Sequence, residues 1–203
     1  MSESLRPTVQ EVFDKIIEIK GAMHHLPKTK NKGAVGHLAE VITGIPISSA
    51  CLDCEDGELK TISLKKDKNG KFKGAESIAV TMLSVQKLEM SNFDDSKCYS
   101  KLKKTLYVPY YRDGDNVQYM QPILVELTID ENVDLKNQLK DDYKNIQSYL
   151  AENGTLEGSS RIGKYLQNRT KGAGKGAPKT RAFYLRASFI NEKLLTDNWF
   201  NSS

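Results

Sequence analysis

The stretch LDCEDGELKTISL, residues 52–64, places Asp53, Glu55, Asp56 and Glu58 around the start of a segment with strand character, and Lys60 follows them. Like-charged side chains this close repel one another unless a cation or a proton lies among them. The stretch therefore predicts either a solvated acidic turn or a metal site.

The second half of the stretch, Glu58 to Leu64, alternates in character and carries β-branched residues, which predicts a β-strand. Side chains of a strand alternate between faces, so Glu58 and Lys60 should point the same way, with Leu59 opposite. Asp53, entering from the preceding loop, can reach the same point. Two carboxylates are the usual protein contribution to a Mg²⁺ ion, and a lysine beside them can orient an attacking water.

The composition is that of an ordinary globular protein. The 203 residues include 38% hydrophobic and 28% charged residues, enough for one core. There is no apolar run of the roughly 20 residues that a membrane span needs, and the first residues do not resemble a signal peptide, so we expect a cytoplasmic protein. Cys51 and Cys54 form a C-x-x-C pair, but every histidine lies upstream of it, which favours a structural role over zinc or redox chemistry.

Charge is unevenly distributed along the chain. Residues 159–190 contain eight basic residues and no acidic one, whereas residues 126–157 contain eight acidic and three basic residues. This asymmetry indicates a polyanion such as nucleic acid as partner, with a simple solvated surface as the alternative.

Several elements are predicted by periodicity and end signals. A capping box at Thr8 begins a helix to about Lys20, and AVGHLAEVITG is a second helix that ends at Gly44. Asn69-Gly70 predicts a hairpin turn. Further strands are expected at residues 77–85, 105–111, 121–129 and 182–189, a helix at 135–150, and a basic glycine-rich loop at 170–179. Pro109 suggests that its strand lies at an edge or a bend. This order predicts an α/β fold with a central mixed sheet flanked by helices.

Five motifs follow one another along the chain: KGAVGHLAEVITG, DCEDGELKT, SKLKKTLYVP, LQNRTKGAGKG and TRAFYLRASF, which span roughly Lys32 to Leu195. Their order and spacing resemble those of the MutH mismatch-repair endonuclease and related type II restriction enzymes that cleave GATC. The resemblance implies the PD-(D/E)xK nuclease fold, with two lobes around a DNA-binding cleft. We expect a catalytic lobe mainly in residues 1–125 and a recognition lobe mainly in 126–203.

The resemblance also implies roles for single residues. Glu40 matches the helix carboxylate that supports the metal site. Asp53 and Glu58 match the Mg²⁺ ligands, and Lys60 matches the catalytic lysine. Lys101, in the K-L-K motif, is the candidate for a second active-site lysine.

On the DNA side, Arg169 and Lys171 match the loop that reads bases in the major groove, with Lys175 as a further candidate. Tyr184 matches the tyrosine involved in sensing adenine methylation, and Arg186 follows it in the same motif. A guanidinium such as that of Arg169 can donate two hydrogen bonds to guanine.

One departure from the family pattern concerns the first metal ligand. Four residues separate Asp53 from Glu58, fewer than in MutH. Glu55 and Asp56 therefore compete with Asp53 for this role.

His37, next to Glu40 on the helix, is assigned no role, and Tyr107, Tyr110 and Tyr111 are interpreted as sheet-packing residues.

The function expected from the resemblance is Mg²⁺-dependent cleavage of double-stranded DNA by a type II restriction enzyme at GATC or a related site, with Mn²⁺ as a substitute metal. A cognate DNA methyltransferase is the expected partner. The sequence leaves open whether the protein acts on DNA as a monomer or as a dimer. The alternatives are a MutH-like nicking enzyme of mismatch repair and a DNA-binding module without catalysis.

Overall fold

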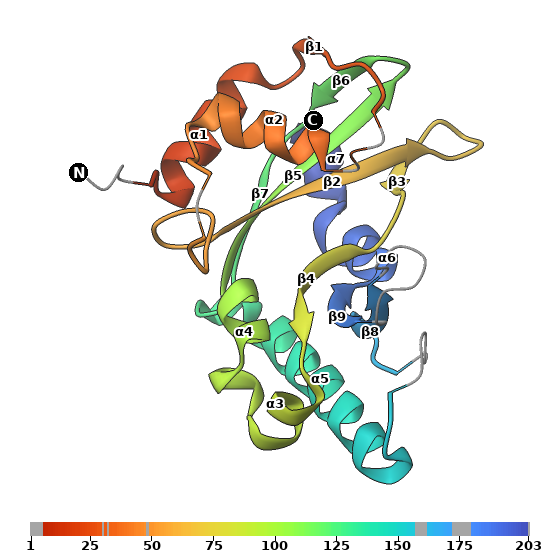
Figure 1. Ribbon diagram of the computed structural model, residues 1–203. Helices are drawn as coiled ribbons and strands as arrows, with labels where there is room; N and C mark the ends of the chain where they lie inside the picture. The colour runs from red at the N-terminus through yellow and green to blue at the C-terminus, as the bar shows by residue number, and fades with distance from the viewer. Residues whose placement is uncertain are drawn as a thin grey trace, which may run out of the picture.

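Two β-sheets of different size organise the chain (Figure 1). The computed structural model describes residues 6–29, 31, 33–47, 49–156, 162–171 and 180–202. The larger sheet has the strand order β1-β6-β5-β2-β3, with β7 also pairing with β5, and the smaller sheet has the order β4-β9-β8.

The larger sheet is mixed, as predicted. Its central strands β2 (Glu58–Lys66) and β5 (Lys104–Asp113) are parallel, and its other pairings are antiparallel. The remaining strands of this sheet are β1 (Met23–His25), β3 (Phe72–Gly74), β6 (Asn116–Tyr119) and β7 (Ile123–Glu126).

The smaller sheet is antiparallel and was not predicted as a separate sheet. It consists of β4 (Ile78–Leu83), β8 (Leu166–Lys171) and β9 (Thr180–Leu185). Strand β4 lies before residue 125 and β9 lies after it, yet the two strands pair in one sheet. The two sheets are therefore not divided at residue 125. The division into two lobes stays a prediction.

Helices flank both sheets. Their bounds are α1 Val9–Ile19, α2 Ala34–Thr43, α3 Val85–Met90, α4 Lys97–Leu102, α5 Val133–Asn153, α6 Ala187–Phe189 and α7 Asp197–Ser202. Short 3₁₀ turns occupy Phe93–Asp95 and Asp130–Asn132, and a π-helical turn, η3, occupies Ile190–Leu194. In the described part of the chain, no helix is long and apolar enough to cross a membrane.

The first two helices begin and end where the sequence predicts. Thr8 and Glu11 form a reciprocal capping box, in which the Thr8 N–H donates to Glu11 Oε2 at 2.7 Å and the Glu11 N–H to Thr8 Oγ1 at 3.2 Å. Helix α2 ends at Gly44, whose φ of 78° lies in the left-handed region.

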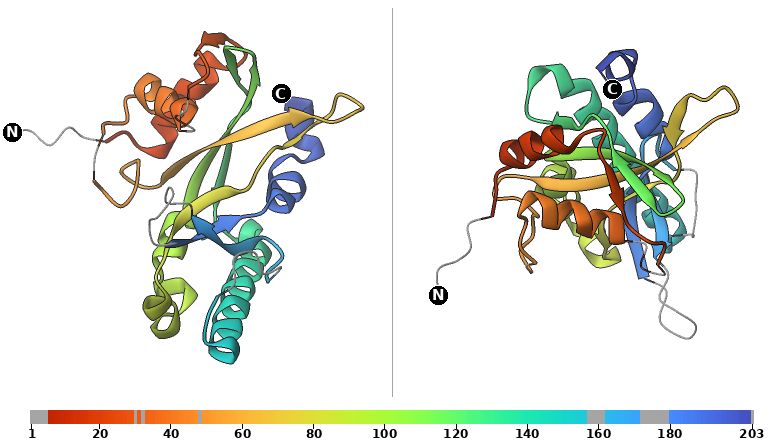
Figure 2. Two further views of the ribbon diagram at one scale, coloured as in Figure 1. Left: turned by 45° about the vertical axis from the view of Figure 1, so that its right-hand side comes forward. Right: turned by 90° about the horizontal axis from the view of Figure 1, so that it is seen from above.

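Two clusters of buried side chains lie on opposite faces of the larger sheet. One cluster joins α1 and α2 to the sheet through Leu59 and Leu106. The other contains Ile62 and Leu64 of β2 together with residues of the smaller sheet and of α5. Figure 2 shows the smaller sheet and α5 together, away from α1 and α2.

Strand β5 is central, which corrects the prediction of an edge or bend for Pro109. It pairs with β2 on one side and with β7 and β6 on the other. Proline, which has no N–H, is tolerated here because the β7 pairing ends at Tyr107 and the β6 pairing begins at Tyr110.

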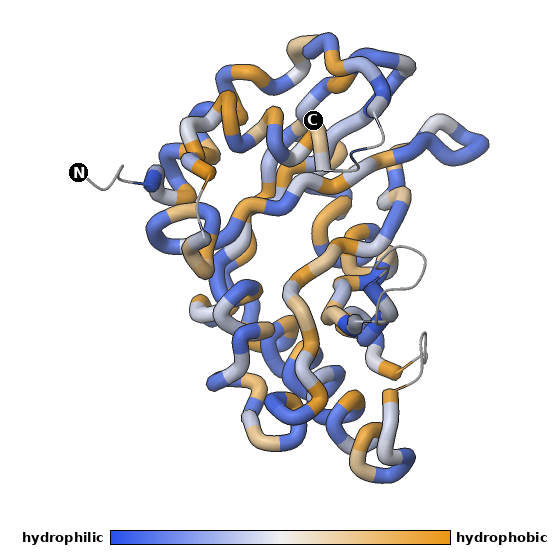
Figure 3. Tube along the Cα trace, in the orientation of Figure 1, coloured by the Kyte–Doolittle hydropathy of each residue, from blue (hydrophilic) through white to orange (hydrophobic). Residues whose placement is uncertain are grey.

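The hairpin turn at Asn69-Gly70 is confirmed, and its tip is hydrophilic (Figure 3).

Candidate active site

A cleft of about 690 Å³ lies between the two sheets. One wall comes from α2 and β2, and the opposite wall comes from residues 76–79, β8 and β9. Strand β2 pairs with β3 only from Leu64 onward, so in the described pairings the edge from Glu58 to Ser63 is left without a partner strand on this side. Asp53 and Lys60 line the cleft at this open edge, whereas Glu58 is buried and is not among the described residues that line it.

Glu58 is the buried centre of the site. Its side chain is 1% exposed and accepts a hydrogen bond from Lys60 Nζ at 2.5 Å. Lys101 Nζ, from α4, donates to the two carboxylate oxygens at 2.8 and 2.7 Å. A buried carboxylate is tolerable only when it is paired and hydrogen-bonded, and two ammonium groups fulfil that condition here.

Asp53 lies beside this pair. Its Oδ2 is 3.7 Å from Lys60 Nζ and accepts a hydrogen bond from the Leu59 N–H at 3.2 Å. Lys60 therefore bridges Asp53 and Glu58, and Leu59 packs on the other face of the sheet, as the alternation predicts. Two carboxylates with hard oxygen donors at one point suit a divalent cation such as Mg²⁺.

Asp56, a competitor of Asp53, is engaged elsewhere. Its carboxylate accepts hydrogen bonds from the Val9 N–H, at 2.8 Å, and from Lys104 Nζ, at 2.5 Å. Partial burial opposes ionisation, but the bonds from Lys104 and Val9 outweigh it, so the pKa of Asp56 is lowered. Glu55 is exposed. Of these three carboxylates, Asp53 is the one in contact with Lys60.

Glu40 reaches the cleft from α2 but does not complete a tight cluster. Its Oε2 is 3.4 Å from His37 Nδ1, and both residues line the cleft. Within the described residues, no group of three or more His, Cys, Asp or Glu side chains is placed to hold a metal ion. The role of Glu40 at the metal stays a prediction.

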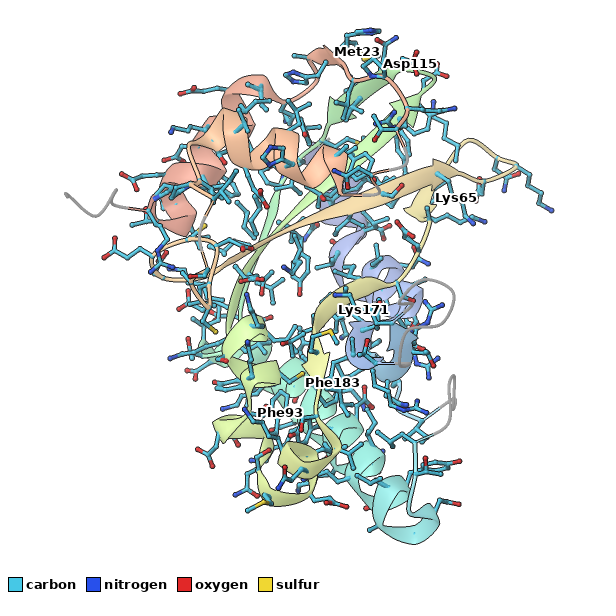
Figure 4. All side chains as sticks on the ribbon, in the orientation of Figure 1. Met23, Lys65, Phe93, Asp115, Lys171 and Phe183 are labelled. Atoms are coloured by element: carbon cyan, nitrogen blue, oxygen red, sulfur yellow. The ribbon has the colours of Figure 1, made fainter. Side chains whose placement is uncertain are left out.

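Two of the predicted DNA-contacting residues lie on the opposite wall of the cleft. Lys171 and Tyr184 line it, and Figure 4 shows Lys171 at the smaller sheet. Arg169 is exposed, with its guanidinium 5.4 Å from the centre of the Tyr184 ring. Arg186 instead donates to the Ile162 carbonyl at 3.1 Å. Lys175 lies outside the described residues.

The structure corrects two local predictions in this region. The strand expected at 182–189 ends at Leu185, and Ala187–Phe189 form helix α6. Thr170 and Lys171 belong to strand β8, where a loop was expected. The pairing partner of Lys171 is Thr180, and that of Arg169 is Ala182. Such a ladder depends on contacts across an intervening segment, which composition alone does not reveal.

Sequence reasoning missed part of the cleft. Glu76 and Ser77 line it from the segment between β3 and β4, and Tyr110 lines it from β5. Linker residues carry no periodic signal, and Tyr110 was interpreted as a packing residue. Tyr107, by contrast, is 2% exposed and packs in the core, as that interpretation expects.

Cys54 and Cys98 have the environment of structural residues, whereas Cys51 is exposed. Cys54 is buried, and burial together with the nearby charge of Asp53 raises its pKa to about 12. Burial also raises the pKa of Cys98. Both thiols therefore stay protonated at neutral pH, which disfavours metal binding or redox exchange.

The fold and the site together define an α/β protein with a carboxylate and lysine site on the open edge of a mixed sheet. Residues 49–142 match the family model described as "DNA mismatch repair enzyme MutH". This range includes Asp53, Glu58, Lys60 and Lys101. The resemblance to MutH-like nucleases is thereby confirmed.

A restriction enzyme is also among the relatives. The chain is 28% identical over 155 residues to the type II restriction enzyme Sau3AI of Staphylococcus aureus. The alignment takes in 68% of this chain but 30% of Sau3AI, so the chain spans less than a third of the length of that relative. Among solved structures, the complex of restriction endonuclease MvaI with its cognate DNA substrate aligns with a TM-score of 0.45 and 14% identity, over 95% of this chain and 96% of that one.

Proposed function

We propose that this chain is a sequence-specific, Mg²⁺-dependent DNA endonuclease of the PD-(D/E)xK type, acting as a type II restriction enzyme at GATC or a related site. The observation that carries the proposal is the bridge that Lys60 makes between Asp53, which like Lys60 lines the cleft, and the buried Glu58. The matches to the MutH model and to the restriction enzyme Sau3AI support DNA as the substrate.

The metal would be held by Asp53 and Glu58, with Glu40 nearby on the cleft wall. Mg²⁺, or Mn²⁺ in its place, supplies a Lewis acid that polarises a phosphoryl oxygen and lowers the pKa of bound water. Glu58 enters this role already oriented, because Lys101 contacts both of its oxygens.

Lys60 would act on the reacting atoms directly. Lys60 lines the cleft and contacts both carboxylates, so its ammonium can orient an attacking water and offset the charge that grows on the phosphorane. Lys101 is more enclosed than Lys60, with 13% against 25% of the side chain exposed, which favours a supporting role through Glu58.

Recognition would come from the smaller sheet. Arg169 stacks on Tyr184 and can donate two hydrogen bonds to a guanine edge. Lys171 and Lys175 are the next candidates for contacts to bases or phosphates, and Tyr184 is the candidate for sensing adenine methylation. Arg186, bonded to Ile162, is better suited to holding this region in place.

Removal of the Lys60 ammonium is the sharpest test of the proposed chemistry. We expect Lys60→Ala to lower the cleavage rate by about 10²–10⁴-fold, the range typical for loss of a positioned catalytic group. Binding to the same DNA should persist. The control is Lys65→Ala, an exposed lysine of the same strand. A Lys60→Ala variant that cuts as fast as the wild type would overturn the assignment of the site.

The mode of cleavage distinguishes the proposal from its two rivals. Plasmid DNA, unmethylated or adenine-methylated, is incubated with the protein and Mg²⁺, with EDTA in a parallel reaction. Linear product that depends on metal, with ends that map to one short sequence, supports a restriction enzyme. Nicked circles support a MutH-like enzyme, which the match to the MutH model favours as the second candidate. Binding without any cleavage supports a module that lacks catalysis.

The proposal of a restriction enzyme leads to two further expectations. A DNA methyltransferase that modifies the same site would protect the host DNA, and it is the partner we propose. The oligomeric state on DNA follows from light scattering of the complex with a duplex that contains one site.

A further inference from the structure

A second hollow, of about 230 Å³, lies beside the first turn of α2. Ala34 and Val35 line this hollow, whereas Gly33 and Gly36 of the same turn line the catalytic cleft. The Tyr110 side chain borders both. The two hollows are therefore neighbours that share one helical turn and one aromatic side chain.

The lining of the second hollow has the chemistry of an anion site. Lys28 and Arg112 supply two positive charges, Thr29 and Asn31 supply polar side chains, and no carboxylate is among the described residues that line it. Within the described residues, neither Lys28 nor Arg112 forms an ion pair with its side chain. Arg112 donates one hydrogen bond, to the Leu26 carbonyl at 3.0 Å, and a guanidinium has five N–H donors.

The segment that carries Lys28 is held in place before any ligand binds. The Lys28 N–H donates to Asp115 Oδ1 at 3.1 Å, and the Leu26 N–H donates to the Asp115 carbonyl at 2.7 Å. Figure 4 places Asp115 at the end of the β5–β6 hairpin. Val35 also lines the hollow, and Tyr119 donates to its carbonyl at 2.8 Å, which fixes the first turn of α2 on the sheet.

We propose that Lys28 and Arg112 bind a backbone phosphate of the DNA where the duplex extends past the catalytic cleft, an inference that rests on the proposed function. Each strand of a duplex presents a phosphate about every 3.4 Å along the axis, so DNA in the cleft brings phosphates to an adjoining cationic hollow. The positive end of the α2 dipole adds to the attraction. The duplex would then contact Lys28 and Arg112 beside the larger sheet as well as Lys171 on the smaller sheet.

The salt dependence of binding tests this contact without relying on cleavage. Affinity for a short duplex with one GATC site is measured by fluorescence anisotropy over a series of KCl concentrations, in EDTA so that no cutting occurs. Loss of one phosphate contact reduces the slope of log K against log salt by about 0.9. We expect Lys28→Gln to reduce the slope, and the reduction to reach about 0.9 when Arg112→Gln is added, because both side chains bind the same phosphate.

A scrambled duplex and a distant lysine provide the controls. Because a phosphate contact carries no sequence information, Lys28→Gln should weaken binding to GATC and scrambled duplexes by the same factor. Lys144→Gln removes the same charge from the exposed face of α5 and should leave the slope unchanged. Wild-type binding with an unchanged slope for Lys28→Gln, or an equal loss for Lys144→Gln, overturns this inference alone. Wild-type protein that binds no DNA overturns the proposed function itself.

Discussion

Single residues at the candidate site combine local and distant contributions. Glu58 and Lys60 meet because they are two apart on one strand, which sequence alternation predicts. Lys101 reaches Glu58 from a helix 43 residues away. Asp53 is brought to Lys60 by a loop whose shape the sequence did not reveal.

The contacts of Arg6 explain how that loop presents Asp53. Arg6 Nη1 donates to the carbonyls of Leu52, at 2.7 Å, and Cys54, at 3.3 Å, the residues on either side of Asp53. The Glu55 N–H donates to the Pro7 carbonyl at 3.0 Å. The segment before α1 therefore holds the acidic loop in spite of the shortened spacing.

Removal of the Arg6 contacts should affect catalysis more than DNA binding. We expect Arg6→Met to lower kcat for DNA cleavage roughly tenfold, the equivalent of one lost hydrogen bond of about 1.4 kcal/mol, with little change in KM. Steady-state cleavage of a duplex with one site measures both constants. Arg6→Lys, which can still donate to both carbonyls, should recover part of the rate. A kcat equal to that of the wild type for Arg6→Met would contradict the positioning role.

At the scale of elements, one buried carboxylate fixes the start of β8. Asp142 of α5 is 1% exposed and accepts hydrogen bonds from the backbone N–H groups of Lys164, Tyr165 and Leu166, at 2.8, 2.7 and 2.8 Å. The chain turns into this contact at Gly163, where φ is +82° and a side chain would collide with the Leu166 carbonyl. The strand that carries Arg169 is thus attached to the longest helix.

We expect Asp142→Ala to be strongly destabilising. Each buried N–H left without a partner costs about 1–3 kcal/mol, so the loss should reach roughly 3 kcal/mol. Urea unfolding of the variant measures it. Asp141→Ala is the matched control, because Asp141 is the exposed neighbour on the same helix and its loss should cost less than about 0.5 kcal/mol. Equal stabilities for the two variants would show that the backbone contacts contribute little.

The capping of α1 by Asp56 should make stability depend on pH in acid. The folded-state pKa of Asp56 lies below its ordinary 3.8, so its contribution is present above that pH and is lost as the pH falls through the folded value. We therefore expect the wild type to be more stable than Asp56→Asn at neutral pH and the difference to disappear in strong acid. Urea unfolding of both proteins across this range measures it, and a difference that does not change with pH would contradict the assignment.

At the scale of the whole molecule, one hydrophobic cluster joins the two sheets. Ile62 and Leu64 of β2 pack in the same cluster as Leu166, Phe183 and Leu185 of the smaller sheet. The C-terminal segment adds polar ties, because Asn191 Oδ1 accepts from the Gly74 N–H at 2.9 Å and Trp199 Nε1 donates to the Gln121 carbonyl at 2.8 Å. Strand β2 and the opposite wall of the cleft therefore share a core.

A shared core predicts cooperative unfolding. We expect urea unfolding followed by Trp199 fluorescence, which reports on the C-terminal segment, to coincide with unfolding followed by far-UV circular dichroism. The chain has one tryptophan, so the fluorescence signal has a defined origin. Two separated transitions would indicate that the sheets unfold independently and that the cleft can open without loss of either sheet.

Much of the framework was accessible from the sequence because it depends on short-range patterns. The capping box of α1, the glycine that ends α2, the hairpin at Asn69-Gly70 and the alternation in β2 each involve residues a few positions apart. Strands β1 and β6 are too short for such a pattern, and the pairing of β8 with β9 crosses an intervening segment.

By itself, the sequence determined helices α1, α2 and α5, the mixed sheet, the Glu58 and Lys60 pair, and the resemblance to MutH, but not the short helices α3, α4 and α6. Only the tertiary structure decided that Asp53 rather than Asp56 contacts Lys60, that Lys101 clamps Glu58, and that β4 joins β9 to form the opposite wall of the cleft. The physical reason is distance along the chain. Local periodicity reports which face a side chain occupies, but contacts between remote segments depend on how the elements pack around a common core.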